Sequence, residues 1–207
     1  MMTSTTTEND HRLVRAMVCG QEGRVRDAQK ELEAILAEQP DHVLANHALG
    51  SLFFHEGQLD WAIKHYDRAL LAAPRFVLGH YDLGVAHYHR GKMIAAANAF
   101  RRCLILDPDF RAAHYRLALS LFHAGHLEEA LDNFRQAVCF TPQYVMAHYH
   151  MGVVHERRGH LESAIREFET SLAGGMGEAS SRFHLTSLRT RVREAHEMES
   201  RVEHINE

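Results

Sequence analysis

This sequence lacks long apolar runs and a surplus of positive charge. No apolar stretch in its 207 residues approaches the roughly 18 to 20 residues needed to cross a bilayer, so no membrane insertion is expected. The formal net charge is −4, whereas binding to the phosphate backbone of nucleic acids needs an excess of Lys and Arg. The sequence therefore predicts no membrane span and no broad nucleic-acid binding.

Cysteine is scarce as well, and none of Cys19, Cys103 and Cys139 belongs to a C-x-x-C pair. One thiol is left over whatever pairing is drawn, which is typical of a reducing compartment. The first ten residues are rich in Thr and Ser, and Arg15 interrupts the apolar stretch 13–19, so no signal-peptide core is expected. These features predict a cytoplasmic protein with buried, inert thiols.

Catalytic motifs are missing too: the sequence contains no G-x-S-x-G and no P-loop. The segment from His155 to His160 looks like a zinc-protease motif, but its two histidines are five residues apart. That motif needs histidines four residues apart, on one face of a helix. We therefore expect no enzymatic activity, no cofactor and no preformed metal site.

Proline occurs only four times, and its spacing is regular: Pro40, Pro74, Pro108 and Pro142 are 34 residues apart. A period of this length indicates a repeat protein. If each proline is position 32 of a repeat, five repeats span residues 9–178, with bounds 9–42, 43–76, 77–110, 111–144 and 145–178. We expect residues 1–8 to be a disordered tail and residues 179–207 to form a C-terminal capping helix.

Four further positions recur in this frame. Position 15 is always glycine, which suits a left-handed helix end, and small residues at positions 8 and 20 let two helices approach closely. Position 24 is always large and would fill the space beside them. In repeat order, position 8 is Ala16, Gly50, Gly84, Ala118 and Gly152; position 15 is Gly23, Gly57, Gly91, Gly125 and Gly159; position 20 is Ala28, Ala62, Ala96, Ala130 and Ala164; position 24 is Leu32, Tyr66, Phe100, Phe134 and Phe168.

This pattern resembles the tetratricopeptide repeat (TPR) family over residues 9 to about 178. The resemblance implies an all-α fold, a right-handed superhelical solenoid of helix-turn-helix repeats. The departures are local. Position 4, often Trp in the family, is Asn46, His80, His114 and His148; Arg15 replaces the leucine of position 7 in the first repeat, and Met176 replaces the fifth proline.

The capping helix is predicted from apolar residues at helical spacing, with charged residues on the other side. A solenoid needs such an end because a terminal repeat has no neighbour to cover its apolar face. The expected apolar side consists of Phe183, Leu185, Leu188, Val192, Ala195 and Val202.

The resemblance also implies a partner-binding surface. In TPR proteins, positions 2, 5, 6, 9, 12 and 13 of the first helix line a concave groove that binds a protein or peptide segment. Here these positions are aromatic, aliphatic and imidazole-bearing with few charges, and the family's carboxylate clamp for chaperone C-termini is missing. The predicted groove residues are His47, Phe54, His55, Tyr81, Asp82, Tyr88, His89, Tyr115, Arg116, Phe122, His123, Tyr149 and His150.

The sequence predicts a non-enzymatic interaction module: an adaptor, assembly factor or scaffold. Two alternatives stay open. In one, the C-terminal helix or the first repeat enters the groove of another copy, which would build an oligomer or an organelle coat. In the other, the 18 histidines, several of which share positions 4, 11 and 13 of the repeats, make a metal-binding or pH-responsive surface.

Overall fold

The computed structural model describes the backbone of residues 2–140, 145–174 and 178–206 and the side chains of 8–139, 145–174 and 179–198. These residues form helices and no strand, so the all-α prediction is confirmed. Pro142 and Met176 lie outside the described residues, as does the side chain of Val202. The helices are α1 (Met2–Gln21), α2 (Val25–Glu38), α3 (Val43–His55), α4 (Leu59–Ala72), α5 (Val77–His89), α6 (Met93–Leu106), α7 (Arg111–His123), α8 (Leu127–Phe140), α9 (Val145–Arg157), α10 (Leu161–Ala173) and α11 (Glu178–Asn206).

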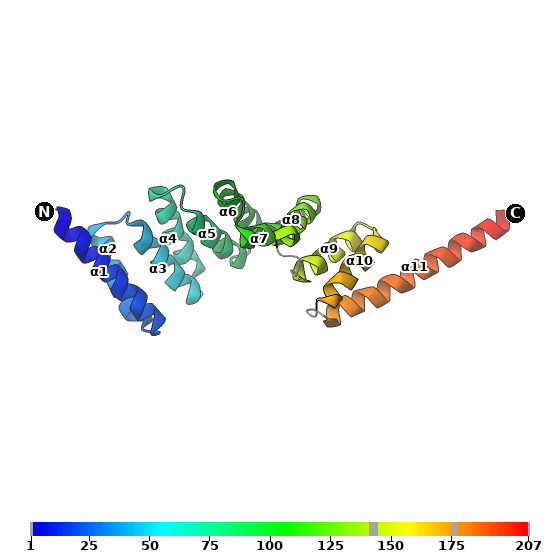
Figure 1. Cartoon of the computed structure of the whole chain (residues 1–207), viewed down its shortest axis with the longest axis horizontal. Helices are drawn as coiled ribbons and strands as arrows, with labels where there is room; N and C mark the ends of the chain where they lie inside the picture. Colours follow the sequence, from blue (N-terminus) through cyan, green and yellow to red (C-terminus); the bar gives the residue numbers. More distant parts are fainter. Residues whose placement is uncertain (1, 141–144, 175–177, 207) are drawn as a thin grey trace. The chain divides into compact units, whose positions relative to one another are not determined.

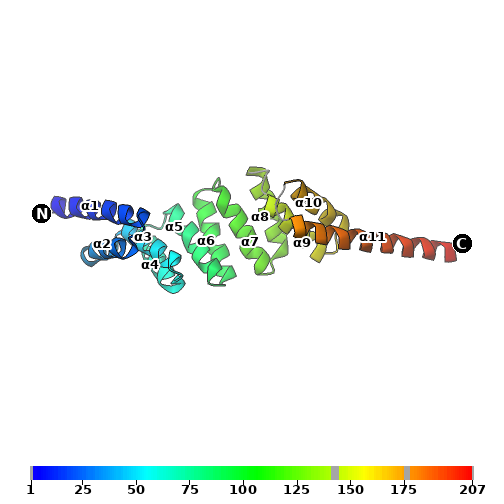
Figure 2. The same ribbon diagram turned by 90° about the horizontal axis from the view of Figure 1, so that it is seen from below.

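The helices form hairpins, and the chain divides into two compact units. The N-terminal unit spans Met1–Ala113 and the C-terminal unit spans His114–Glu207. In both views, α1 lies beside α2, α3 beside α4, α5 beside α6, and α9 beside α10 (Figures 1 and 2). Helices α3, α5, α7 and α9 begin at the first residues of repeats 2 to 5. We call the first helix of each repeat helix A and the second helix B.

The glycine at position 15 turns helix A into helix B. All five of these glycines have φ between 73° and 85°, and they are the residues with positive φ in the described chain. After α3, the Gly57 amide donates to the Phe54 carbonyl (3.0 Å) and the Gln58 amide to the Phe53 carbonyl (2.8 Å). This is the Schellman hydrogen-bond pattern, which satisfies carbonyls at the helix end and requires a left-handed residue.

The small residue at position 8 of helix A packs against the large ring at position 24 of helix B. A Cβ added to Gly84 would lie 2.7 Å from Phe100, and one added to Gly152 would lie 2.8 Å from Phe168. The large residues at position 24 are at most 2% exposed, and the alanines at position 20 at most 1%. The predicted close approach of the paired helices is therefore present.

The side chain at position 4 ties helix A to the loop that precedes it. The Asn46 side-chain amide donates to the Pro40 carbonyl (2.9 Å), and the His80 imidazole lies 3.0 Å from the Pro74 carbonyl. The Asn46 oxygen also accepts from His65 (3.0 Å), a buried histidine of helix B. Asn or His at position 4 therefore supplies a hydrogen-bond partner for the backbone carbonyl of the loop proline.

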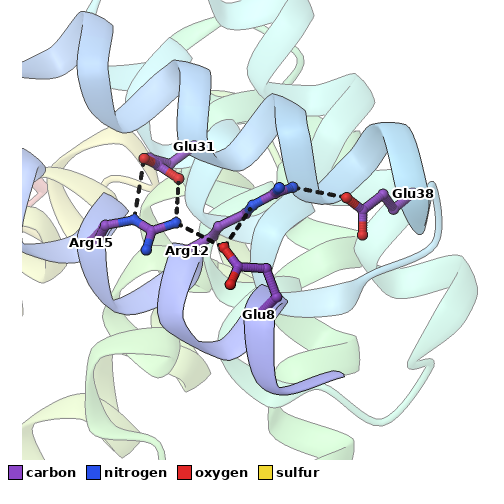
Figure 3. Close-up of polar contacts among 5 residues, drawn as sticks. All are labelled: Glu8, Arg12, Arg15, Glu31 and Glu38. Carbon is purple, nitrogen blue, oxygen red and sulfur yellow. Dashed lines mark hydrogen bonds and ion pairs between the residues drawn. The ribbon is translucent and has the colours of Figure 1, made fainter. Parts of the chain in front are cut away.

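The first repeat differs from the others in two ways: its helix A starts earlier, and Arg15 holds position 7. Helix α1 begins at Met2, so the expectation of a disordered tail over residues 1–8 differs from the structure. Glu8 pairs with Arg12 (3.4 Å) and Arg15 (3.2 Å) along α1, and a helix once formed gains one backbone hydrogen bond per added residue. Arg15 also pairs with Glu31 of α2 (3.2 Å), and Arg12 with Glu38 (2.9 Å), as Figure 3 shows. The unusual Arg15 thus takes part in an ion-pair network.

Helix α11 starts as a sixth helix A. Ser181, Leu185 and Leu188 are buried, and they hold positions 3, 7 and 10 counted from residue 179. These are the positions that Ala147, Met151 and Val154 hold in α9, which are also buried. Position 15 is Arg193 instead of glycine, so no turn follows, and α11 continues past α10 in both views (Figures 1 and 2).

Three residues were predicted to be buried and are exposed: Phe183, Ala195 and Cys139. Phe183 was expected on the apolar side of the capping helix, but it is 73% exposed because it is two residues, about 200° of helix, away from Leu185. Cys139 was expected to be buried and is exposed at the end of helix B, whereas Cys19 and Cys103 are buried. Burial raises the pKa of the Cys103 thiol to about 12, so this cysteine stays a neutral thiol.

Candidate functional site

The candidate site is the surface made by positions 2, 5, 6, 9, 12 and 13 of each helix A, which we call the helix-A face. Each compact unit has its own helix-A face: α1, α3 and α5 contribute it in the N-terminal unit, and α7 from His114 onward, α9 and α11 contribute it in the C-terminal unit. All thirteen predicted groove residues lie on one of these two faces.

In the N-terminal unit, neighbouring A helices contact each other through two pairs of side chains. His47 of α3 binds Asp82 of α5 through Nε2 and Oδ2 (2.7 Å), which joins position 5 to position 6 of the next repeat. The rings of Phe54 and His89 meet edge to face at 5.4 Å and join position 12 to position 13. Tyr81 lies against Phe110 (5.0 Å). The face therefore contains interlocked rings and one histidine–carboxylate hydrogen bond.

In the C-terminal unit, His150 is surrounded by aromatic rings. It stacks on Phe134 with ring centroids 5.5 Å apart and an interplanar angle of 11°, and Phe122, Tyr149 and Tyr115 lie at 5.5, 5.4 and 6.2 Å. Burial, together with the nearby His123, lowers the pKa of His150 to about 4. This imidazole is therefore neutral at neutral pH.

His184 holds the corresponding place one repeat later, because both residues are at position 6. It stacks on Phe168 (4.8 Å, 11°), as His150 stacks on Phe134. Its Nδ1 atom, however, binds Glu156 Oε2 at 2.7 Å, and Arg191 lies 3.6 Å from the same carboxylate. Position 12 is Glu156 here, whereas it is Phe122 beside His150.

The predicted groove residues differ in exposure. The three histidines at position 13, His55, His89 and His123, are exposed, and Phe122 is buried. The other nine are half-buried, and three of the four tyrosines, Tyr81, Tyr115 and Tyr149, pack against the phenylalanine at position 24 of their own repeat. Leu44 and Leu78, at position 2, are 50% and 43% exposed.

Five charged or ring-bearing residues of the C-terminal face were not among the predicted groove residues: Glu156, Arg157, Phe183, His184 and Arg191. The Arg157 guanidinium lies 4.7 Å above the Phe122 ring. The repeat period points to all five, because adding 34 to Phe122, His123, Tyr149, His150 and Arg157 gives Glu156, Arg157, Phe183, His184 and Arg191.

Many of the histidines form contacts that hold the fold together. His148 of α9 binds Glu167 of α10 at 2.7 Å, and burial lowers the pKa of His65, His87 and His155. Among the described residues, no three His, Cys, Asp or Glu side chains are grouped as a metal ion would require. Nor does the described part of the chain contain a helix long and apolar enough to span a membrane.

The geometry defines the class of protein: it is built from repeated helical hairpins, and helix A of repeats 2 to 5 carries a face rich in aromatic and imidazole rings. The tetratricopeptide repeat family model matches residues 14–76, 57–102 and 81–144, which together cover well over half of the chain. The chain belongs to the tetratricopeptide repeat family. No curated protein of similar sequence was found.

Solved structures of TPR-type fold resemble the chain along most of its length. MamA of Desulfovibrio magneticus RS-1 has a TM-score of 0.76 at 17% identity, with 83% of this chain and 97% of that chain covered. YrrB has a TM-score of 0.78 at 17% identity, with 83% and 89% covered. PilF of Pseudomonas aeruginosa has a TM-score of 0.70 at 16% identity, with 93% of each chain covered. At these identities the likeness shows the fold alone.

Proposed function

We propose that this chain is a non-enzymatic protein-interaction module that binds a segment of another protein on its helix-A faces. One observation carries the proposal. The aromatic and imidazole rings of these faces lock against each other between repeats, yet most of them stay partly exposed, and the position-13 histidines are exposed. Rings held in place lose little freedom on binding, and aromatic side chains contribute much of the energy of interfaces.

The relatives support this proposal. YrrB, which shares the fold, is described as a TPR protein with an unusual peptide-binding site. The thirteen predicted groove residues are retained as the proposed binding surface, and Phe183, His184 and Arg157 are added to it. The His–carboxylate pairs, such as His47–Asp82, join neighbouring helices, and we assign them no catalytic role. A cytoplasmic location stays a prediction from the cysteine pattern.

A random 12-residue peptide library displayed on phage and selected on the immobilised full chain tests the proposal. Selected peptides are then titrated by calorimetry against the wild type and the double variant His89→Ala, His123→Ala. Both histidines are exposed, so their loss should leave the fold intact while weakening binding about fivefold or more, or ~1 kcal/mol. Gln136→Ala, an exposed change on α8, is the matched control. A library that yields no binder, or equal affinities for the two proteins, contradicts the proposal.

Self-assembly is a second candidate function, favoured by one feature of α1. Val14, Met17 and Val18 are 59%, 59% and 43% exposed, and Val14 and Val18 line a cavity between α1 and α2 together with Cys19 and Lys30. Such an apolar edge would be covered by a second copy. Light scattering tests this, because Met17→Glu should shift the full chain toward the monomer. A wild-type chain that stays monomeric at high concentration removes the candidate.

A further inference from the structure

The helix-A face of the C-terminal unit carries positive charge that the N-terminal face lacks. On α7, α9 and α11, the face positions include Arg116, Arg157 and Arg191, with Glu156 as the one acidic residue. On α1, α3 and α5, the same positions contain no Lys or Arg and include Asp10 and Asp82. The two faces therefore differ in the sign of the charge that their Lys, Arg, Asp and Glu residues carry.

The opposite charge in the C-terminal unit lies on its B helices. Helix α8 carries Glu128, Glu129 and Asp132 against one arginine, Arg135. Helix α10 carries Glu162, Glu167 and Glu169 against one arginine, Arg166. In α11, which begins at Glu178, residues 179–193 contain the face and have four arginines and no acidic residue. Three of these arginines pair with carboxylates, Arg189 with Glu169, Arg191 with Glu156 and Arg193 with Glu197. Basic side chains are therefore concentrated on and beside the helix-A face.

The single acidic residue of the face does not cancel this charge. The Glu156 carboxylate is held by His184 (2.7 Å) and Arg191 (3.6 Å), so it is already compensated. Within the described part of the chain, no carboxylate pairs with Arg116 or Arg157. Arg157 is exposed with its guanidinium over the Phe122 ring, and Phe183 is 73% exposed on the neighbouring α11.

We propose that the helix-A face of the C-terminal unit binds an acidic protein segment that also carries an apolar anchor residue. Carboxylates of the segment pair with Arg157 and Arg116, since a guanidinium presents two parallel donors to a carboxylate. The anchor residue covers the Phe183 ring. The inference rests on the proposed function, because it names the chemistry of the segment bound there. A net charge of −4 and the acidic B helices oppose a long phosphate backbone as the partner.

The peptide selection is repeated with three forms of the full chain: the wild type, the double variant Arg116→Glu, Arg157→Glu, and the control Arg166→Glu. Arg166 is an exposed arginine on α10 whose side chain bonds Ser163 (3.0 Å), away from the helix-A face. Thermal unfolding of each form verifies that it is folded. The wild type and Arg166→Glu should enrich acidic peptides with an aromatic or aliphatic residue, and the double variant should lose the acidic preference.

An enriched acidic peptide should bind the double variant about tenfold more weakly, and its affinity for the wild type should fall as salt is raised. Peptides that are enriched without an acidic preference, or a preference that survives in the double variant, overturn this inference and leave the proposed function standing. Failure to enrich any peptide overturns both. A 20-nucleotide single-stranded RNA that binds more tightly than the peptides, and only to forms with both arginines, would show a nucleic-acid site instead.

Discussion

Replacing Gly84 by leucine tests the packing at the centre of each repeat. A Cβ at this position already lies 2.7 to 2.9 Å from three atoms of the Phe100 ring, and Phe100 is 0% exposed. Leucine adds three more carbon atoms in the same direction. The ring has little room to move aside, because it is fully buried and the helix that carries it is buried at Ala96 and Cys103 as well.

The magnitude follows from two opposing terms. Overpacking of a well-packed core costs about 1 to 3 kcal/mol, and a fully buried ring places this case near ~3 kcal/mol. Leucine favours the helix over glycine by about 0.8 kcal/mol. The net loss in the free energy of unfolding is therefore about 2 kcal/mol, which lowers the melting temperature by roughly 4 to 8 °C in a chain of this size.

The assay is thermal unfolding followed by circular dichroism, with Gly20→Leu as the matched control. Gly20 lies in α1, and a Cβ there would meet no atom within 4 Å. The control should keep or raise the melting temperature. A double-mutant cycle with Phe100→Ala should show coupling of at least ~1 kcal/mol, because the smaller side chain makes room for the leucine. An unchanged melting temperature for Gly84→Leu would refute the packing argument.

Three further predictions concern the turn glycine Gly91, the reactivity of the cysteine thiols and the stability of the chain at acidic pH. Gly91→Ala should destabilise by about 1 to 2 kcal/mol in urea unfolding, because φ is 79° there although no atom blocks the Cβ; a neutral result would contradict this. A thiol reagent should label Cys139 in the native chain and all three cysteines only after denaturation. Because His150 has a pKa of about 4 folded and about 6.5 unfolded, its contribution of about 3 kcal/mol is present above pH 6.5 and is lost as the pH falls toward 4. Melting curves from pH 7.5 to 4.5 measure this loss, and Phe122→Glu should reduce it by giving His150 a carboxylate.

The helical hairpins could be predicted from the sequence because each depends on contacts inside one repeat. The turn at Gly57 involves only neighbouring residues, and the contact between Gly84 and Phe100 joins the two helices of one hairpin. Both features recur every 34 residues. Five copies of a pattern average out local exceptions. A single repeat would not have been sufficient to identify the pattern, since position 8 is alanine in the first and fourth repeats (Ala16 and Ala118) and glycine in the others.

The two ends of the chain were predicted less well because they lie outside the five repeats, where the 34-residue period gives no information about structure. The helix of residues 2–8 has no equivalent in later repeats, and Glu8 reaches Arg12 and Arg15 only once that helix exists. In α11, the apolar spacing correctly predicted a helix with Leu185 and Leu188 buried, but it also placed Phe183 on the buried side. The register of a sixth helix A instead predicts which residues of α11 are buried, and in that register Phe183 is exposed to solvent.

The candidate site shows where the repeat period stops being informative. His150 and His184 occupy the same position, stack on the same kind of ring at the same 11° angle, and yet differ in charge environment. The difference comes from position 12 of the preceding repeat, which is Phe122 for one and Glu156 for the other. The period predicts where a side chain lies, but the charges beside it depend on a residue 28 positions away, in the preceding helix A. The chemical environment of each helix-A face is therefore set by pairs of residues from successive repeats, and it differs between repeats whose backbone is alike.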